Sequence, residues 1–343
     1  MSAAELDLQV ARTIQNWISG RNTDIGRVFF AEPHAAASLA AVLREDDVAI
    51  VTAADADAVA GYGASVVGYG GDLREVGDEL FVSDRRIELL DYVAAGFVEI
   101  LGPTVVRFMD KAGWSAFIDD VDIARRTGVF PGALVDPKMQ LADREALVAP
   151  FEEEPPRSLH LREDGRVALG AQGIDLGDDL VAATAQWHPR LATLGGIAPL
   201  DDIANDLCSR PWLARCVRAG DLTKMLRLDL NIDRISGFGW SIVDDGLADA
   251  EPVVEDPLIV TAAGEFILAS PTTLRRQRLS ETTAAVVEIV QTSSATDLAA
   301  SRISAQLAVS ELDARRLCEQ AHDRLDIHPG HASLPAAQRS PRL

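Results

Sequence analysis

One stretch, Leu274-Arg275-Arg276-Gln277-Arg278-Leu279-Ser280, decides the fold of the C-terminal fifth of the chain. Before Ser280 the apolar residues recur with a period of two, and after it with a period near 3.6, so strands give way to helices there. The Ser280 hydroxyl is suited to accept from the free backbone N–H groups of a first helical turn. Polar residues outnumber apolar ones in 274–279. This composition favours an edge strand that faces water or a partner.

A hairpin is predicted directly before this stretch and three helices directly after it. Leu258–Thr261 and Glu265–Leu268 flank an Ala-Gly turn, which is typical of a β-hairpin. Helices are expected over 281–291 and 295–307, and a third begins after a Ser310 cap. The third helix carries an apolar stripe of Ala314, Leu317, Cys318, Ala321 and Leu325. Residues 258–326 are therefore predicted to form a three-stranded antiparallel sheet followed by three helices.

This order of elements, with a third strand that ends Arg-x-Leu-Ser, resembles the PqqD-like recognition element of ribosomally synthesised, modified peptides (RiPPs). That element is a winged-helix-type domain that binds leader peptides. The resemblance covers about 69 of the 343 residues. Ser280 stands where Asn is common in the family, and Ser293-Ser294 stands where an Asp-Gly turn is frequent. Both replacements keep the capping or turn chemistry.

The resemblance implies a peptide-binding groove, because in this family the leader adds as a strand to the third strand and lies against the third helix. The implied peptide-binding residues are Leu274, Arg275, Arg276, Gln277, Arg278 and Leu279 on the strand and Leu312, Arg315, Arg316 and Glu319 on the helix. The arginines on both elements lead us to expect an acidic leader. In the alternative interpretation they only solubilise the domain or pair with Glu281 and Glu319.

The whole chain is similar in length, domain order and acidic, Ala-rich character to the recognition proteins of daptide biosynthesis. That resemblance implies a non-catalytic protein without a cofactor, which holds a precursor leader peptide by β-strand addition. It also implies three partner enzymes that modify the precursor: an oxidoreductase, an aminotransferase and a methyltransferase.

A content of 48% hydrophobic and 25% charged residues is typical of a folded protein. A chain of 343 residues is longer than a single hydrophobic core usually supports, so two or three domains are expected. We expect an α/β (or α+β) scaffold domain over 1–155, with short strands and helices. An α+β middle domain over 156–257, the winged-helix-like domain over 258–326 and a flexible tail over 327–343 are expected to follow. The charge and the prolines of Glu152–Pro156 suggest the first linker.

The charge argues against nucleic acid as a partner. Residues 1–257 hold 23 basic and 44 acidic side chains, a net charge of −21, whereas 258–326 has a net charge of −2. Phosphate backbones are bound through cationic contacts. A winged-helix transcriptional regulator with an acidic sensor domain is the alternative, but acids surround the arginines of the third helix and would meet the phosphates. The acids in question are Glu311, Asp313, Glu319 and Asp323.

The three cysteines cannot all pair in disulfides, and their spacing fits no zinc site. We therefore expect the protein in a reducing cytoplasm. No secretory signal and no apolar run of about 20 residues is found, so we expect no membrane partner.

The N-terminal part follows an α/β order. A first helix ends at Gly20, and strand, helix and strand are expected at Arg27–Phe30, Ala35–Arg44 and Val48–Val51. A long helix is expected over Arg86–Leu101. Further expected elements are strands at 65–67, 78–82 and 105–109, a helix at 114–126, a hairpin at 159–169, helices at 180–194 and 200–226, and strands at 228–233 and 235–243.

No catalytic or metal-binding residue is predicted. Gly61-Tyr62-Gly63 lacks the further glycine of a dinucleotide loop, since Val66 stands there. Arg234 occupies the glycine position of the calcium-like Asp229-x-Asn231-x-Asp233. The acidic run Asp119–Asp122 is expected on a solvated helix face, and His328 with His331 is too small a ligand set. An enzyme with an unrecognised site in residues 1–257 stays an alternative.

Overall fold

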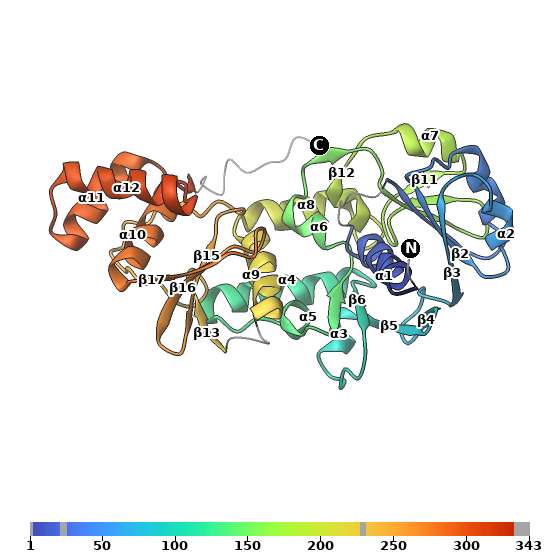
Figure 1. Ribbon diagram of the computed structural model, residues 1–343, viewed down its shortest axis with the longest axis horizontal. Coiled ribbons are helices and arrows are strands. Elements are labelled where there is room, and N and C mark those ends of the chain that lie inside the picture. Colours follow the sequence, from blue (N-terminus) through green and yellow to red (C-terminus); the bar gives the residue numbers. More distant parts are fainter. Residues whose placement is uncertain (1–2, 21–25, 227–230, 333–343) are drawn as a thin grey trace. The chain divides into compact units, whose positions relative to one another are not determined.

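The computed structural model describes residues 3–20, 26–226 and 231–332 (Figure 1). The chain divides into two compact units. The first comprises Met1–Phe117 and Lys138–Ala204, and the second comprises Ile118–Pro137 and Asn205–Leu343. The division falls within two helices, α4 (Lys111–Thr127) and α8 (Leu200–Ser209).

A mixed sheet is the framework of the first unit. Within the described residues it has ten strands in the order β11-β10-β9-β1-β2-β3-β4-β5-β6-β7. Their bounds are β1 (Val28–Ala31), β2 (Val48–Thr52), β3 (Ser65–Gly71), β4 (Glu79–Val82), β5 (Arg85–Asp91), β6 (Thr104–Arg107), β7 (Met139–Leu141), β9 (Ser158–Leu161), β10 (Val167–Leu169) and β11 (Asp175–Gly177). Strands β9, β1, β2 and β3 pair in parallel, as do β5, β6 and β7. The expected α/β class is therefore confirmed for this part of the chain.

One long helix and several short ones accompany this sheet. They are α1 (Ala3–Ser19), η1 (Ala36–Ala41), α2 (Ala56–Val59), α3 (Tyr92–Ala95), α6 (Arg144–Val148), α7 (Leu180–Ala185) and η2 (Arg190–Leu194), and a two-stranded pair joins β8 (Glu153–Glu154) to β12 (His188–Pro189). Helix α1 packs on the sheet through Trp17, whose ring stacks on Phe30 at 4.4 Å between centroids. Phe30 in turn stacks on Tyr69 at 4.7 Å. This aromatic stack fixes α1 against β1 and β3.

The helix expected over Arg86–Leu101 is wrong. Residues 85–91 form β5, which pairs with β4 on one side and β6 on the other. Only the four-residue α3 follows, after Asp91 accepts a hydrogen bond from the Val93 N–H. Phe97, which lies within the range of the expected helix, is 85% exposed. Strand pairing on two sides outweighs the helical spacing of the apolar residues, because β structure depends on partners that are distant in sequence.

The domain boundary expected at residue 155 is also wrong, because it would cut the sheet. β9 follows the Pro155-Pro156 pair and lies in parallel beside β1, with Phe30 opposite His160. The hairpin expected over 159–169 is confirmed as β9 and β10. The expected helix over 180–194 is instead α7, the short β12 and η2.

The second unit contains α5 (Gly132–Val135), α9 (Leu213–Leu226) and the four-stranded sheet β13-β15-β16-β17. The strands are β13 (Ile232–Ile235), β15 (Leu258–Ala262), β16 (Glu265–Ala269) and β17 (Arg276–Leu279). The hairpin of β15 and β16 is confirmed, and the range of the predicted helix over 200–226 holds two helices, α8 and α9, with Pro211 between them. The predicted number of three strands is wrong, because β13 adds a fourth strand beside β15.

The strand expected over 235–243 ends at Ile235, because Gly237 and Gly239 turn the chain with φ of +85° and +64°. Part of the strand expected at 228–233, and Asp229 of the calcium-like pattern, lie outside the described residues.

Three helices cover one face of this sheet: α10 (Glu281–Gln291), α11 (Thr296–Leu307) and α12 (Glu311–Leu325). Figure 1 shows them gathered on one side of the strands. Both predicted caps are confirmed, since Ser280 accepts from the Thr283 N–H and Ser310 from the Asp313 N–H, each at 3.1 Å. The core between helices and sheet includes Leu268 of β16, Val287 of α10, Ile303 of α11 and Cys318 of α12.

Two buried charged groups attach the segment before the hairpin to these helices. The Glu288 carboxylate of α10 accepts from the N–H groups of Ile242 and Val243, each at 2.7 Å. The Arg302 guanidinium of α11 contacts both oxygens of Asp245, at 2.8 and 3.0 Å. Such bidentate, charge-assisted bonds are strong and directional. They hold residues 242–245 in one position.

The prediction that a flexible tail begins at residue 327 is wrong, because residues 327–332 are ordered against the second unit. Ile327 is fully buried in the helix core. The His328 N–H donates to Asp256 at 2.8 Å, and β18 (His331–Ala332) pairs with β14 (Ala250–Glu251). Residues 333–343 lie outside the described part of the chain. Of the helices that the structure describes, none combines the length and the apolar character needed to cross a bilayer.

We expect Gly71→Ala to destabilise the protein by roughly 2 kcal/mol or more, as for other residues forced into an incompatible backbone conformation. Gly71 has a φ of +79°, and an added Cβ would lie 1.9 Å from the Glu79 carbonyl oxygen on β4. Urea unfolding measures the change. Gly70→Ala is the matched control, since its Cβ would meet no atom within 4 Å. Equal stability of the two variants would contradict this role of Gly71.

Candidate peptide-binding site

Strand β17 forms one edge of the four-stranded sheet. The Ser270 N–H donates to the Arg275 carbonyl oxygen at 3.0 Å, which makes these two residues a hydrogen-bonded pair. Hydrogen-bonded and non-hydrogen-bonded pairs alternate along antiparallel strands. Leu268–Gln277 is therefore the next hydrogen-bonded pair. The backbone groups of Arg276 and Arg278 consequently point outward, away from β16.

The side chains of β17 divide between the two faces of the sheet, as strand alternation requires. Leu279 packs with Phe266 against the core beneath the helices. Arg276 and Arg278 project from the other face. There they line a concavity together with Ile267 and Glu265 of β16.

The strand expected over 274–279 is shorter than predicted. Leu274 and Arg275 lie before β17, and Leu274 has a φ of +59°. The Leu274 N–H donates to the Ser270 carbonyl oxygen at 3.0 Å, which closes the connecting turn. Leu274 is 61% exposed. Of the six predicted strand residues, four therefore belong to β17 and two to the turn before it.

The four predicted helix residues lie on one exposed side of α12. Arg315 pairs with Asp297 of α11 at 3.0 Å, and Arg316 pairs with Asp313 one turn earlier at 3.3 Å. Leu312 is 61% exposed, and Glu319 is exposed on the next turn. These ion pairs lie within the helices, just as Arg278 pairs with Glu265 within the sheet at 3.1 Å. The structure thus places the predicted strand residues beside one another at β17 and the predicted helix residues beside one another on α12.

Sequence reasoning missed the residues that complete the concavity. Asp233 of β13 and Ala262 of β15 line it beside the β17 arginines. Asp233 was singled out only as part of a calcium-like pattern. The alternation around it was visible, but its pairing with a strand more than twenty residues later carries no local signal.

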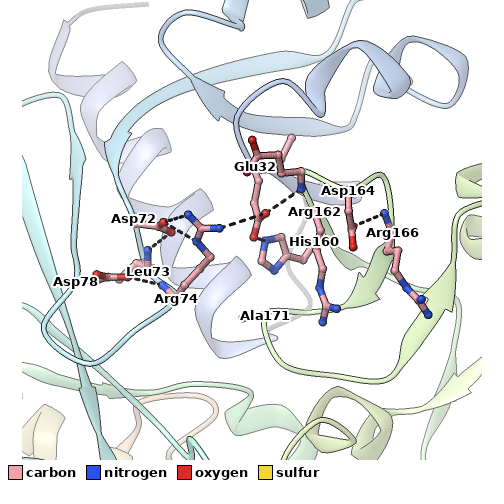
Figure 2. A network of polar contacts seen from close by, with 12 residues as sticks. Glu32, Asp72, Leu73, Arg74, Asp78, His160, Arg162, Asp164, Arg166 and Ala171 are labelled. Atoms are coloured by element: carbon pink, nitrogen blue, oxygen red, sulfur yellow. Dashed lines mark hydrogen bonds and ion pairs between the residues drawn. The ribbon is translucent and has the colours of Figure 1, made fainter.

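A second polar cluster lies in the first unit, at the carboxyl ends of β1 and β9 (Figure 2). Strands β1, β2 and β3 follow one another to one side, and β9 lies on the other side of β1. Such a reversal of strand order is where ligands of open α/β sheets usually bind. Sequence reasoning named none of these residues, although polar residues that directly follow predicted parallel strands are a usable signal.

Glu32 is the centre of this cluster and is 6% exposed. His160 Nε2 lies 3.2 Å from Glu32 Oε1, in a contact that is poorly aligned for a hydrogen bond. The Glu163 N–H donates to Glu32 Oε2 at 2.9 Å, and Arg74 Nη1 lies 3.7 Å from the same oxygen. The contact with His160 is the largest cause of a Glu32 pKa lowered to about 2; burial opposes it, and the Glu163 amide and Arg74 add to it.

A buried carboxyl and a buried guanidinium lie near the ends of β6 and β7. Burial raises the pKa of Asp143 to about 7, although Arg107 opposes the rise. Arg107 donates to the Leu73 and Ala171 carbonyl oxygens at 2.8 and 3.3 Å and to the Gln172 side chain at 3.3 Å. The oxygens of Glu32 and the N–H donors of Arg107 contact other groups of the protein. A structural role, in which these contacts stabilise the first unit, therefore explains both clusters.

Comparison of the chain with protein-family models, with curated proteins and with solved structures finds no match.

The lowered Glu32 pKa predicts an acid-dependent loss of stability. A carboxyl whose folded pKa lies below its unfolded value of 4.5 stabilises the fold fully above about pH 4.5 and progressively less toward pH 2. The difference corresponds to about 3 kcal/mol. We expect Glu32→Gln to remove most of this pH dependence in urea unfolding followed by near-UV circular dichroism.

Glu163→Gln is the control for this experiment, because it keeps the backbone donor and changes an exposed carboxylate. The same slope of stability against pH in Glu32→Gln and in the unmodified protein would show that Glu32 is not the group responsible.

Proposed function

We propose that this chain is a non-catalytic peptide-recognition protein, which binds the leader of a ribosomally made precursor by β-strand addition to β17. The proposal depends mainly on the edge position of β17, where the backbone N–H and C=O groups of Arg278 are directed outward. An extended peptide can satisfy such groups as a neighbouring strand would. Main-chain bonds would supply affinity, and the flanking side chains would supply selectivity.

The order of elements supports this proposal. A hairpin, an edge strand and three helices follow one another over residues 258–325, as in the winged-helix-type RiPP recognition elements that the sequence resembles. The additional strand β13 lies at the far edge of the sheet, beside β15. It therefore leaves the β17 edge open to a peptide.

The exposed side of α12 is the proposed second wall of the site. Leu312 offers exposed apolar surface there, and Arg315, Arg316 and Glu319 surround it with charge. An exposed leucine beside ion-paired arginines suits a peptide that has apolar and acidic residues.

We further propose that the protein presents the precursor to the modifying enzymes of daptide-like biosynthesis: an oxidoreductase, an aminotransferase and a methyltransferase. Recruitment would hold the precursor's reactive end at high local concentration near these enzymes. Co-purification of the chain with one of them, dependent on precursor, would support this step.

Arg278→Pro tests strand addition directly. We expect it to weaken binding of a leader peptide at least tenfold, because proline removes an outward N–H donor that β16 does not use. The probes are fluorescein-labelled leaders encoded by short open reading frames beside the gene. Fluorescence anisotropy with the full chain measures their affinity, since a fragment from Leu258 onward would lack β13.

Arg278→Gln is the matched control, because it keeps the N–H donor and removes only the guanidinium. Equal affinities of the proline and glutamine variants would contradict strand addition, provided that circular dichroism shows both to be folded.

A further inference from the structure

The loop that leads into β17 contains a leucine in an unfavourable backbone conformation. Leu274 has a φ of +59°. In this left-handed region the Cβ of an L-residue crowds the backbone, so hairpin loops usually have Gly or Asn at such a position. The other non-glycine residues with positive φ in the described part of the chain have short or polar side chains: His34, Ser83, Asp143, Ala263, Ala308 and Asp326. The backbone alone would therefore favour another residue in place of Leu274.

Hydrogen bonds to Ser270 hold the loop in this conformation. The Ser270 hydroxyl accepts from the Thr273 N–H at 3.1 Å, and the Ser270 carbonyl oxygen accepts from the Leu274 N–H at 3.0 Å. Ser270 is 7% exposed, and the next residue, Pro271, is buried. The connection between β16 and β17 is therefore preorganised, and its contacts offset the strain at Leu274.

The core of the sheet does not explain the leucine side chain. Leu274 is 61% exposed, whereas Ile267 and Leu268 of the preceding strand are 6% and 5% exposed. Burial of apolar surface stabilises a fold, so a mostly exposed leucine returns little for the strain of its backbone. Strained residues that the surrounding structure holds in place are common at ligand-binding sites. The combination of strain and exposure therefore indicates a contact that is made only in a complex.

The position of Leu274 connects it with the proposed peptide edge. The loop continues directly into β17, and Leu274 precedes Arg278 by four residues. A peptide that pairs with the edge at Arg278 and extends toward the amino end of β17 would reach the loop within roughly 13 Å, at about 3.3 Å per residue. The peptide would pass the exposed leucine there.

We propose that Leu274 is a specificity-determining residue, and that the bound peptide carries a large apolar side chain that packs on it, about three to five residues from the position paired with Arg278. This inference rests on the proposed strand addition to β17 and specifies the chemistry of its ligand. Packing would remove the apolar surface of both side chains from water. The free protein bears the cost of the conformation, and the complex gains from it.

Leu274→Asn and Leu274→Gly separate binding from folding. We expect both to raise the midpoint of urea unfolding, because Asn and Gly adopt a positive φ more easily than Leu. Both should weaken binding of a leader peptide roughly fivefold or more, because the apolar contact is lost. The probes are fluorescein-labelled leaders encoded by short open reading frames beside the gene, and fluorescence anisotropy with the full chain measures their affinity. A residue that only supports the fold would not change stability and affinity in opposite directions.

Two protein variants and one set of peptides are the controls. Leu274→Met keeps the apolar surface and should bind within about twofold of the unmodified protein. Ser83→Gly relieves a φ of +53° in the exposed turn between β4 and β5 and should leave the affinity unchanged. In the leader, each large apolar residue is replaced by Ser in turn. At one position this replacement should make the unmodified protein and Leu274→Asn bind equally, as a direct contact requires.

Unchanged affinity of Leu274→Asn for a leader whose binding Arg278→Pro weakens would overturn the role of Leu274 and leave strand addition standing. Leaders that do not bind, or that Arg278→Pro does not weaken, would overturn strand addition and this inference with it. A lower urea midpoint in both Leu274 variants would show that the side chain supports the fold, which would overturn the inference. A dimer of the free protein that dissociates in Leu274→Asn would overturn it too, because a second copy would then cover the leucine.

Discussion

The edge position of β17 is the constraint on which the arrangement of the second unit depends. An edge strand leaves alternate backbone N–H and C=O groups without partners in the sheet. Within this sheet β15 and β16 are paired on both sides, and α10, α11 and α12 bury one face. The edge is therefore held rigidly while it stays open. That combination is what a strand-adding peptide needs, because a preformed partner strand lowers the entropic cost of binding.

Local chemistry explains how much of this could be predicted from the sequence. Ser280 and Ser310 set helix starts through their hydroxyl groups, so the first residues of α10 and α12 were predicted correctly. The β15–β16 hairpin followed from one Ala-Gly turn. Each of these features depends on residues that are close together in the chain.

Long-range pairing explains the errors. β13 joins β15 across an intervening loop, β5 needs both β4 and β6, and β9 crosses the predicted domain boundary to reach β1. Glu32 and His160 meet because their strands are neighbours, although 128 positions separate them in the chain. The spacing of apolar residues in one segment contains no information about which distant strand lies beside it.

Hydrogen exchange at the β17 amides measures strand addition most directly. With the full chain and a leader peptide in excess, the account predicts at least tenfold slower exchange at the amide of Arg278. The amide of Gln277, which already pairs with Leu268, should change little. Unchanged exchange at the amide of Arg278 in the peptide-saturated protein would contradict the account, whatever the protection elsewhere.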